Sequence, residues 1–195
     1  MQTTSHRMDS SPDLSIVIPV YKNLYTVEIL HTRLRRVLRD AGIRYEIIFV
    51  DDACPEGSLG VLKRLAEQDA QVAVLAMDKN IGQQHAVIVG LGVSAGNSIA
   101  IMDADLQDPP EALPLLLEKL SQGYDVVFAG RRGKYESGSR LFTSRVYKLV
   151  LHLLTGLPRD AGLFLAMRQD VVRRVVAMNS RHSHLVATLG GLGVH

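Results

Sequence analysis

The chain has 195 residues, of which 47% are hydrophobic and 22% are charged, and its formal net charge is +2. This is the composition of a soluble globular protein, long enough for one substantial domain and short for two. The small net charge gives no support to nucleic-acid binding, and the single cysteine, Cys54, excludes an internal disulfide and fits a reducing compartment.

Strands and helices are expected to alternate along the chain. A polar segment, 1–12, is expected to be a flexible tail, and the β-branched run that follows it, 14–20, is expected to be a buried strand. Further strands are expected at 45–50, 72–77, 98–102 and 125–129, and helices at 26–40, 58–68, 83–94 and 111–121. This order predicts an α/β fold, with a mainly parallel sheet and helices on both faces.

Unusual polar residues follow three of the expected strands. They are Pro19-Val20-Tyr21, Asp51-Asp52 and Asp103-Ala104-Asp105-Leu106-Gln107. In parallel sheets ligands bind beyond the carboxyl ends of the strands, so these segments, which are far apart in the sequence, should meet at one edge.

The acidic segment has the composition of a magnesium or manganese site. If residues 103–107 are extended, Asp103, Asp105 and Gln107 point to one side, and Ala104 and Leu106 to the other. Hard oxygen ligands without His or Cys favour Mg²⁺ or Mn²⁺ over zinc, and magnesium commonly completes its shell with substrate phosphates. The alternative is a simple acidic loop, in which Asp108 or Glu111 favours the N-terminus of the next helix.

Four segments resemble glycosyltransferase family 2, and most closely its polyprenyl-phosphate transferases, such as dolichyl-phosphate mannose synthases and bacterial undecaprenyl-phosphate sugar transferases. The segments are SIVIPVYKN (15–23), EIIFVDDACPEGS (46–58), NIGQQHAVIVGL (80–91) and IMDADLQDPPE (101–111). The resemblance implies a Rossmann-like GT-A domain over 13–195 and an inverting, hexosyltransferase-type enzyme of cell-envelope glycan synthesis. It also implies a UDP- or GDP-linked sugar donor, Mg²⁺ or Mn²⁺, and a polyprenyl phosphate acceptor.

The resemblance also implies roles for individual residues. The residues that it places around the nucleotide sugar are Pro19, Val20, Tyr21, Asp52, Gln83, Asp103 and Ala104. It makes Asp105 and Gln107 metal ligands, and Asp103, Asp105 and Asp160 the catalytic carboxylates. It places the acceptor phosphate on Arg131, Arg140 and Ser144, for which the alternative is a solvated basic helix face.

The sequence departs from the family pattern at three places: Ala53-Cys54 replaces a Gly-Ser turn, Lys22-Asn23 replaces a common Asn-Glu, and Leu165 replaces an arginine common in relatives. We also expect the domain to lack the family's C-terminal membrane helices. Two other readings therefore stay open: the same chemistry on a soluble or lipid-linked glycan, and a non-catalytic protein that only binds nucleotide sugars. We expect a cytoplasmic protein, at the inner face of the membrane if it associates peripherally, and we leave homo-oligomer formation open.

Overall fold

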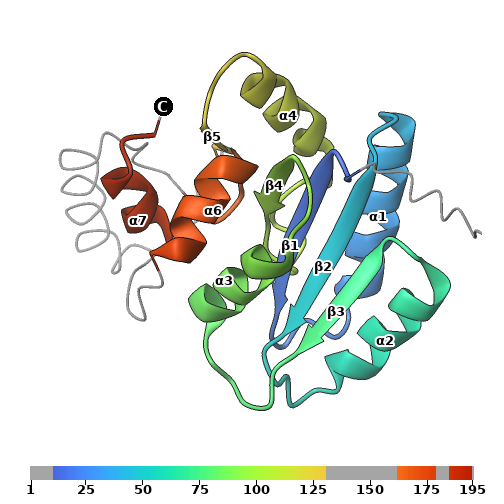
Figure 1. The fold of residues 1–195 in the computed structure, drawn as a ribbon. Helices are drawn as coiled ribbons and strands as arrows, with labels where there is room; N and C mark the ends of the chain where they lie inside the picture. Colours follow the sequence, from blue (N-terminus) through green and yellow to red (C-terminus); the bar gives the residue numbers. More distant parts are fainter. Residues whose placement is uncertain (1–10, 131–161, 179–184, 195) are drawn as a thin grey trace, which may run out of the picture.

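The computed structural model describes residues 11–130, 162–178 and 185–194. These residues form a six-stranded sheet with helices packed against it (Figure 1). The strands are β1 (Leu14–Val20), β2 (Tyr45–Asp51), β3 (Val72–Ala76), β4 (Ser98–Ile101), β5 (Val126–Phe128) and β6 (Leu165–Arg168). The helices are α1 (Val27–Asp40), α2 (Ser58–Gln68), α3 (Gln83–Val93), the 3₁₀ turn η1 (Pro110–Ala112), α4 (Leu113–Ser121), α6 (Gln169–Ala177) and α7 (Leu185–Gly191). The predicted α/β fold is confirmed.

The sheet is mainly parallel, as predicted, and its strand order is β3-β2-β1-β4-β6-β5. β1 pairs in parallel with β2 and β4, and β2 pairs in parallel with β3. The exception is β6, which is antiparallel to both of its neighbours, β4 and β5. Sequence reasoning did not predict β6, because four residues carry too little periodicity to identify a strand and its pairing depends on two distant segments.

Two hydrophobic clusters cover the two faces of the sheet. Residues of α1, α2 and α4 pack on one face, and residues of α3, α6 and α7 pack on the other. In α1 the buried residues Leu30, Leu34 and Leu38 recur every four positions, which turns one stripe of the helix to the core. Gly90 lets α3 approach β1 closely, because a Cβ at that position would lie 2.4 Å from Val17 Cγ1.

No helix in the described ranges combines the length and the apolar character needed to cross a membrane. Most of the predicted tail, 1–12, lies outside the described residues, so its flexibility stays a prediction.

Candidate functional site

A cavity of about 490 Å³ opens at the edge of the sheet where β1, β2 and β4 end. The segments that sequence reasoning expected to meet at one edge therefore do meet there. All of the residues expected around a nucleotide sugar line this cavity, namely Pro19, Val20, Tyr21, Asp52, Gln83, Asp103 and Ala104. Asp105 also lines it, whereas Gln107 does not. Below, this cavity is called the strand-end cleft.

Asp52 fixes the loop that forms one wall of the strand-end cleft. Its side chain is almost completely buried, with 2% exposed. Its Oδ1 accepts a hydrogen bond from the backbone amide of Ile81 over 2.6 Å, and its Oδ2 accepts one from the backbone amide of Gly82 over 2.9 Å. Each carboxylate oxygen has a second acceptor site, so Asp52 can hold this loop and still accept a hydrogen bond from a ligand.

Asp51, the residue before it, is buried in a different way. It is 3% exposed, and its Oδ1 is the one buried side-chain oxygen or nitrogen, among the described residues, without a hydrogen-bond partner. Burial raises the pKa of the Asp51 carboxyl above its ordinary value; a hydrogen bond from the Cys54 backbone amide offsets part of this rise, and the negative charge of Asp52 adds to it. The two adjacent aspartates therefore differ: Asp52 is held by two amides, and the surroundings of Asp51 favour its neutral form.

The acidic segment after β4 is a turn, so the expectation of an extended backbone over 103–107 is wrong. Leu106 has φ +66°, in the left-handed region, and the amide of Gln107 donates to Asp105 Oδ1 over 3.0 Å. This local bond from an aspartate to the backbone two residues on competes with extended structure. Ala104 and Leu106 pack on the core, as expected, and Asp105 and Gln107 are exposed. Gln107 does not line the cleft with Asp103 and Asp105, however, so the three side chains do not share one side as expected.

Two further acidic residues, Asp108 and Glu111, support the surroundings of this turn. The Asp108 side chain is fully buried, and its Oδ2 accepts the backbone amide of Asp103 over 3.4 Å. Glu111 pairs with Arg33 of α1 over 2.6 Å, and the hydrogen bond from Arg33 lowers the pKa of Glu111. Sequence reasoning offered Asp108 only as a helix N-terminal charge and missed its contact with Asp103, which forms only because the chain turns between them.

Two neighbouring glutamines at the start of α3 point to different parts of the protein. Gln83 Nε2 donates to Asp103 Oδ1 over 2.6 Å. Gln84 Oε1 accepts the backbone amide of Leu185, in α7, over 3.1 Å. The first turn of α3 therefore contacts both the acidic turn and the C-terminal helix α7.

The donor atoms of the cleft suit a hard divalent cation that arrives with part of its own ligand shell. Among the described residues no three His, Cys, Asp or Glu side chains form a metal cluster. The two carboxylates that line the cleft near the acidic turn, Asp103 and Asp105, match the one or two that Mg²⁺ usually takes from a protein, with phosphates and water supplying the rest. The residue set therefore fits Mg²⁺ or Mn²⁺ bound together with a phosphate-bearing ligand.

The Ala53-Cys54 replacement keeps the turn after β2. Ala53 has φ +51°, a conformation that glycine adopts without strain, so the backbone is retained at a cost in energy. Cys54 Sγ accepts the amide of Lys22 and the hydroxyl of Ser58, each over 3.1 Å. Burial alone would raise the pKa of the Cys54 thiol, but these hydrogen bonds, with others from nearby amides, lower it overall.

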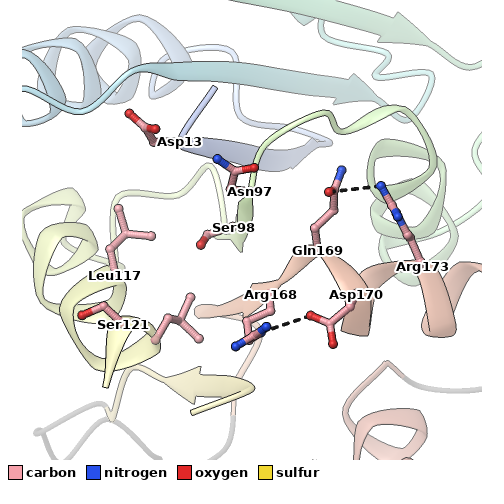
Figure 2. Close-up of a pocket in the computed structure, with 10 residues that line it drawn as sticks. Asp13, Asn97, Ser98, Leu117, Ser121, Arg168, Gln169, Asp170 and Arg173 are labelled. Carbon is pink, nitrogen blue, oxygen red and sulfur yellow. Dashed lines mark hydrogen bonds and ion pairs between the residues drawn. The ribbon is translucent and has the colours of Figure 1, made fainter. Parts of the chain in front are cut away.

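A second cavity, of about 640 Å³, lies at the opposite edge of the sheet, where β1 and β4 begin (Figure 2). Its two arginines already have partners: Arg168 forms an ion pair with Asp170 over 3.1 Å, and Arg173 donates a hydrogen bond to Gln169 Oε1 over 3.3 Å, as Figure 2 shows. Balanced charges and the distance from the acidic turn make this cavity the weaker candidate for a phosphate-bearing ligand.

The expected acceptor residues lie outside the described residues. They are Arg131, Arg140, Ser144 and Asp160, and their roles stay predictions. Leu165 is described: it is fully buried in β6 and pairs in register with Ile101 of β4. It is a core residue of the sheet and not part of the cleft wall.

Comparisons with known proteins agree with this geometry. The family model described as "Glycosyl transferase family 2" matches residues 15–181. An undecaprenyl-phosphate 4-deoxy-4-formamido-L-arabinose transferase from Pseudomonas paraeruginosa is 36% identical over 186 residues, which cover 93% of this chain and 55% of that protein. The chain thus spans about half the length of the curated relatives that it matches.

Solved structures share the fold. A mannosyltransferase from Pyrobaculum calidifontis, in complex with GDP-Man and Mn²⁺, superposes with a TM-score of 0.62 at 20% identity, covering 86% of this chain and 47% of that one. A glucosyl-3-phosphoglycerate synthase from Mycobacterium tuberculosis, in complex with Mn²⁺, UDP and phosphoglyceric acid, superposes with a TM-score of 0.62 at 17% identity, covering 82% and 57%. At these identities the likeness concerns the GT-A fold alone.

Proposed function

This chain belongs to glycosyltransferase family 2, and we propose that it transfers a sugar from a nucleotide diphosphate to a polyprenyl phosphate. The observation that carries the proposal is the strand-end cleft, where Asp52 and the acidic turn, from distant parts of the sequence, line one cavity. The name of the similar Pseudomonas transferase supports the acceptor class, because that protein is described as acting on undecaprenyl phosphate.

Within the cleft, the end formed by Pro19, Tyr21 and Asp52 would hold the nucleobase. Tyr21 is 42% exposed at the opening, where its ring can stack on a planar base. Asp52 retains acceptor sites for the base N–H groups, and the loop that it holds closes the same side of the cleft. Uracil and guanine both present such donors, so this end does not by itself choose between UDP and GDP.

At the other end, Asp103 and Asp105 would hold Mg²⁺ or Mn²⁺ against the diphosphate. When bound, the cation offsets the negative charge that grows on the leaving diphosphate. The Asp105 carboxylate is exposed, and its Oδ1 accepts a hydrogen bond from the Gln107 amide. It can therefore bind a cation without first breaking a buried ion pair. Asp103 is fixed by Gln83, and its backbone is fixed by Asp108, so the carboxylate is in place before the donor arrives.

The acceptor phosphate would be held by Arg131, Arg140 and Ser144, with Asp160 facing it. A phosphate is largely ionised at neutral pH and can attack the anomeric carbon directly, from the face opposite the diphosphate. Inversion follows from such a single displacement. Asp160 then positions the acceptor and is not required as a general base.

A test of the donor half separates this function from simple nucleotide-sugar binding. Thermal shift with a panel of UDP- and GDP-sugars, with and without Mn²⁺, should identify one donor whose binding is strengthened by the metal. Slow hydrolysis of that donor should require Mn²⁺ and should be abolished in Asp105→Asn. Binding without any hydrolysis or transfer would instead identify a non-catalytic nucleotide-sugar-binding protein.

A further inference from the structure

Gln83 lies between the two ends of the strand-end cleft. Its Nε2 donates to Asp103 Oδ1 over 2.6 Å, a short distance typical of a hydrogen bond to a charged acceptor. The two residues before it, Ile81 and Gly82, donate their backbone amides to Asp52. A continuous series of contacts therefore runs from Asp52, through residues 81–83, to Asp103.

The backbone that carries Gln83 has little freedom. Gly82 has φ +85°, a conformation in which a residue with a side chain would be strained. Gly82 is also the N-cap residue of α3, and no side chain at this position caps the helix. The Asp52 carboxylate instead fixes the chain that enters the helix, because it accepts hydrogen bonds from the amides of Ile81 and Gly82 just before α3. Further along α3, Gly90 packs directly on Val17 of β1, which fixes the helix against the sheet.

We propose that Gln83 is a positioning residue, which fixes the Asp103 carboxylate for the metal–diphosphate end of the cleft and is itself held by Asp52. The resemblance to the family implied only a contact between Gln83 and the nucleotide sugar. The geometry gives it a role through Asp103, because a hydrogen bond from the amide N–H restricts the rotation of the Asp103 carboxylate and favours one orientation in the cleft. This inference rests on the proposed function, in which Asp103 acts at the metal–diphosphate end.

The consequence is a defect in metal binding without a defect in nucleotide binding. Gln83→Leu keeps most of the side-chain volume and removes the donor to Asp103. Substitution of a residue that orients a metal ligand typically weakens metal affinity by about 10- to 100-fold. Gln84→Leu is the matched control, because Gln84 is the adjacent glutamine of the same helix and contacts Leu185 instead of Asp103.

Titration calorimetry of Mn²⁺ into the protein saturated with UDP or GDP, whichever the wild type binds, provides a readout other than activity. Gln83→Leu should weaken Mn²⁺ binding about tenfold or more, whereas Gln84→Leu and metal-free nucleotide affinity should change by less than about twofold. In an Asp103→Ala background, Gln83→Leu should have little further effect on Mn²⁺ affinity, because the carboxylate that Gln83 holds has already been removed.

The outcomes separate this inference from the function on which it rests. If the wild type binds Mn²⁺ with the nucleotide and the two leucine variants behave alike, the positioning role is overturned and the proposed function stands. If metal-free nucleotide affinity falls as much as Mn²⁺ affinity in Gln83→Leu, the residue contacts the nucleotide instead. If the wild type shows no metal-dependent nucleotide binding, both proposals are overturned.

Discussion

Removing the Asp52 carboxylate should destabilise the whole fold as well as the cleft. In Asp52→Ala, the amides of Ile81 and Gly82 lose their acceptor at a site where the side chain is 2% exposed. A hydrogen bond to a charged group contributes about 1.5–3 kcal/mol, so losing both should lower the free energy of unfolding by about 3–6 kcal/mol. That is a large part of the roughly 5–15 kcal/mol of a typical domain.

Urea denaturation followed by circular dichroism measures this loss. With an m-value of about 2 kcal/mol/M, the midpoint for Asp52→Ala should fall by about 1.5–3 M. Asp105→Asn is the control, because Asp105 is exposed and the asparagine keeps the oxygen that accepts the Gln107 amide. Its midpoint should reflect a change below about 0.5 kcal/mol. Equal midpoints for the two variants would refute the claim that Asp52 holds the loop before α3.

Three other predictions concern the residues around the cleft. Ala53→Gly should raise the free energy of unfolding by about 0.5–1 kcal/mol, because Ala53 has φ +51°, which glycine adopts without strain. The control Ala41→Gly, at φ −82°, should give no gain in the same denaturation assay, and a gain there too would point to a general effect of glycine. Gly90→Ala should destabilise the fold by about 1–3 kcal/mol, because its Cβ would lie 2.4 Å from Val17 Cγ1 and 3.1 Å from Val50 Cγ2. The position of Gly92 has open space around it, so Gly92→Ala should be neutral or stabilising. A larger loss of stability in Gly92→Ala than in Gly90→Ala would contradict the packing of α3 on β1. The pKa of Asp51 is raised above 3.8, so its neutral form stabilises the fold below that pH and the stabilisation is lost as the pH rises through the folded-state pKa. Asp51→Asn cannot ionise, and its stability relative to wild type should therefore increase from pH 3 to pH 7 in thermal melts; a difference that does not change with pH would contradict the raised pKa.

Much of the fold follows from local sequence patterns. The bounds expected for the first strand and for the helix at 58–68 agree with β1 and α2, because each is a compact run of one periodicity with clear turn residues beside it. β6 was not predicted, although its residues Leu165–Met167 are apolar. Its reversed direction and its place between β4 and β5 depend on pairing with segments far away in the sequence.

The candidate site was predictable in its residues and less so in their contacts. Parallel strand order was enough to bring Pro19, Asp52 and Asp103 to one cleft. The partners of Asp52 were not predictable, because they are backbone amides whose position depends on how α3 packs on the sheet. The turn at Leu106 was also missed, since the residue type gives no sign of a left-handed conformation, and that turn leaves Gln107 outside the cleft lining. The role of Gln107 as a metal ligand stays a prediction.

The most direct test of the proposed function measures sugar transfer to a water-soluble, short-chain polyprenyl phosphate. With the donor identified by thermal shift and with Mn²⁺ present, the wild-type protein should form a sugar–phosphate–prenyl product with an inverted anomeric configuration, as determined by NMR. Chelation of the metal, or Asp105→Asn, should abolish the product, and Asp105→Asn should leave the melting temperature of the ligand-free protein unchanged. Product formation that persists in Asp105→Asn and after chelation would contradict the central claim, that the acidic turn after β4 supports transfer through a metal-bound diphosphate.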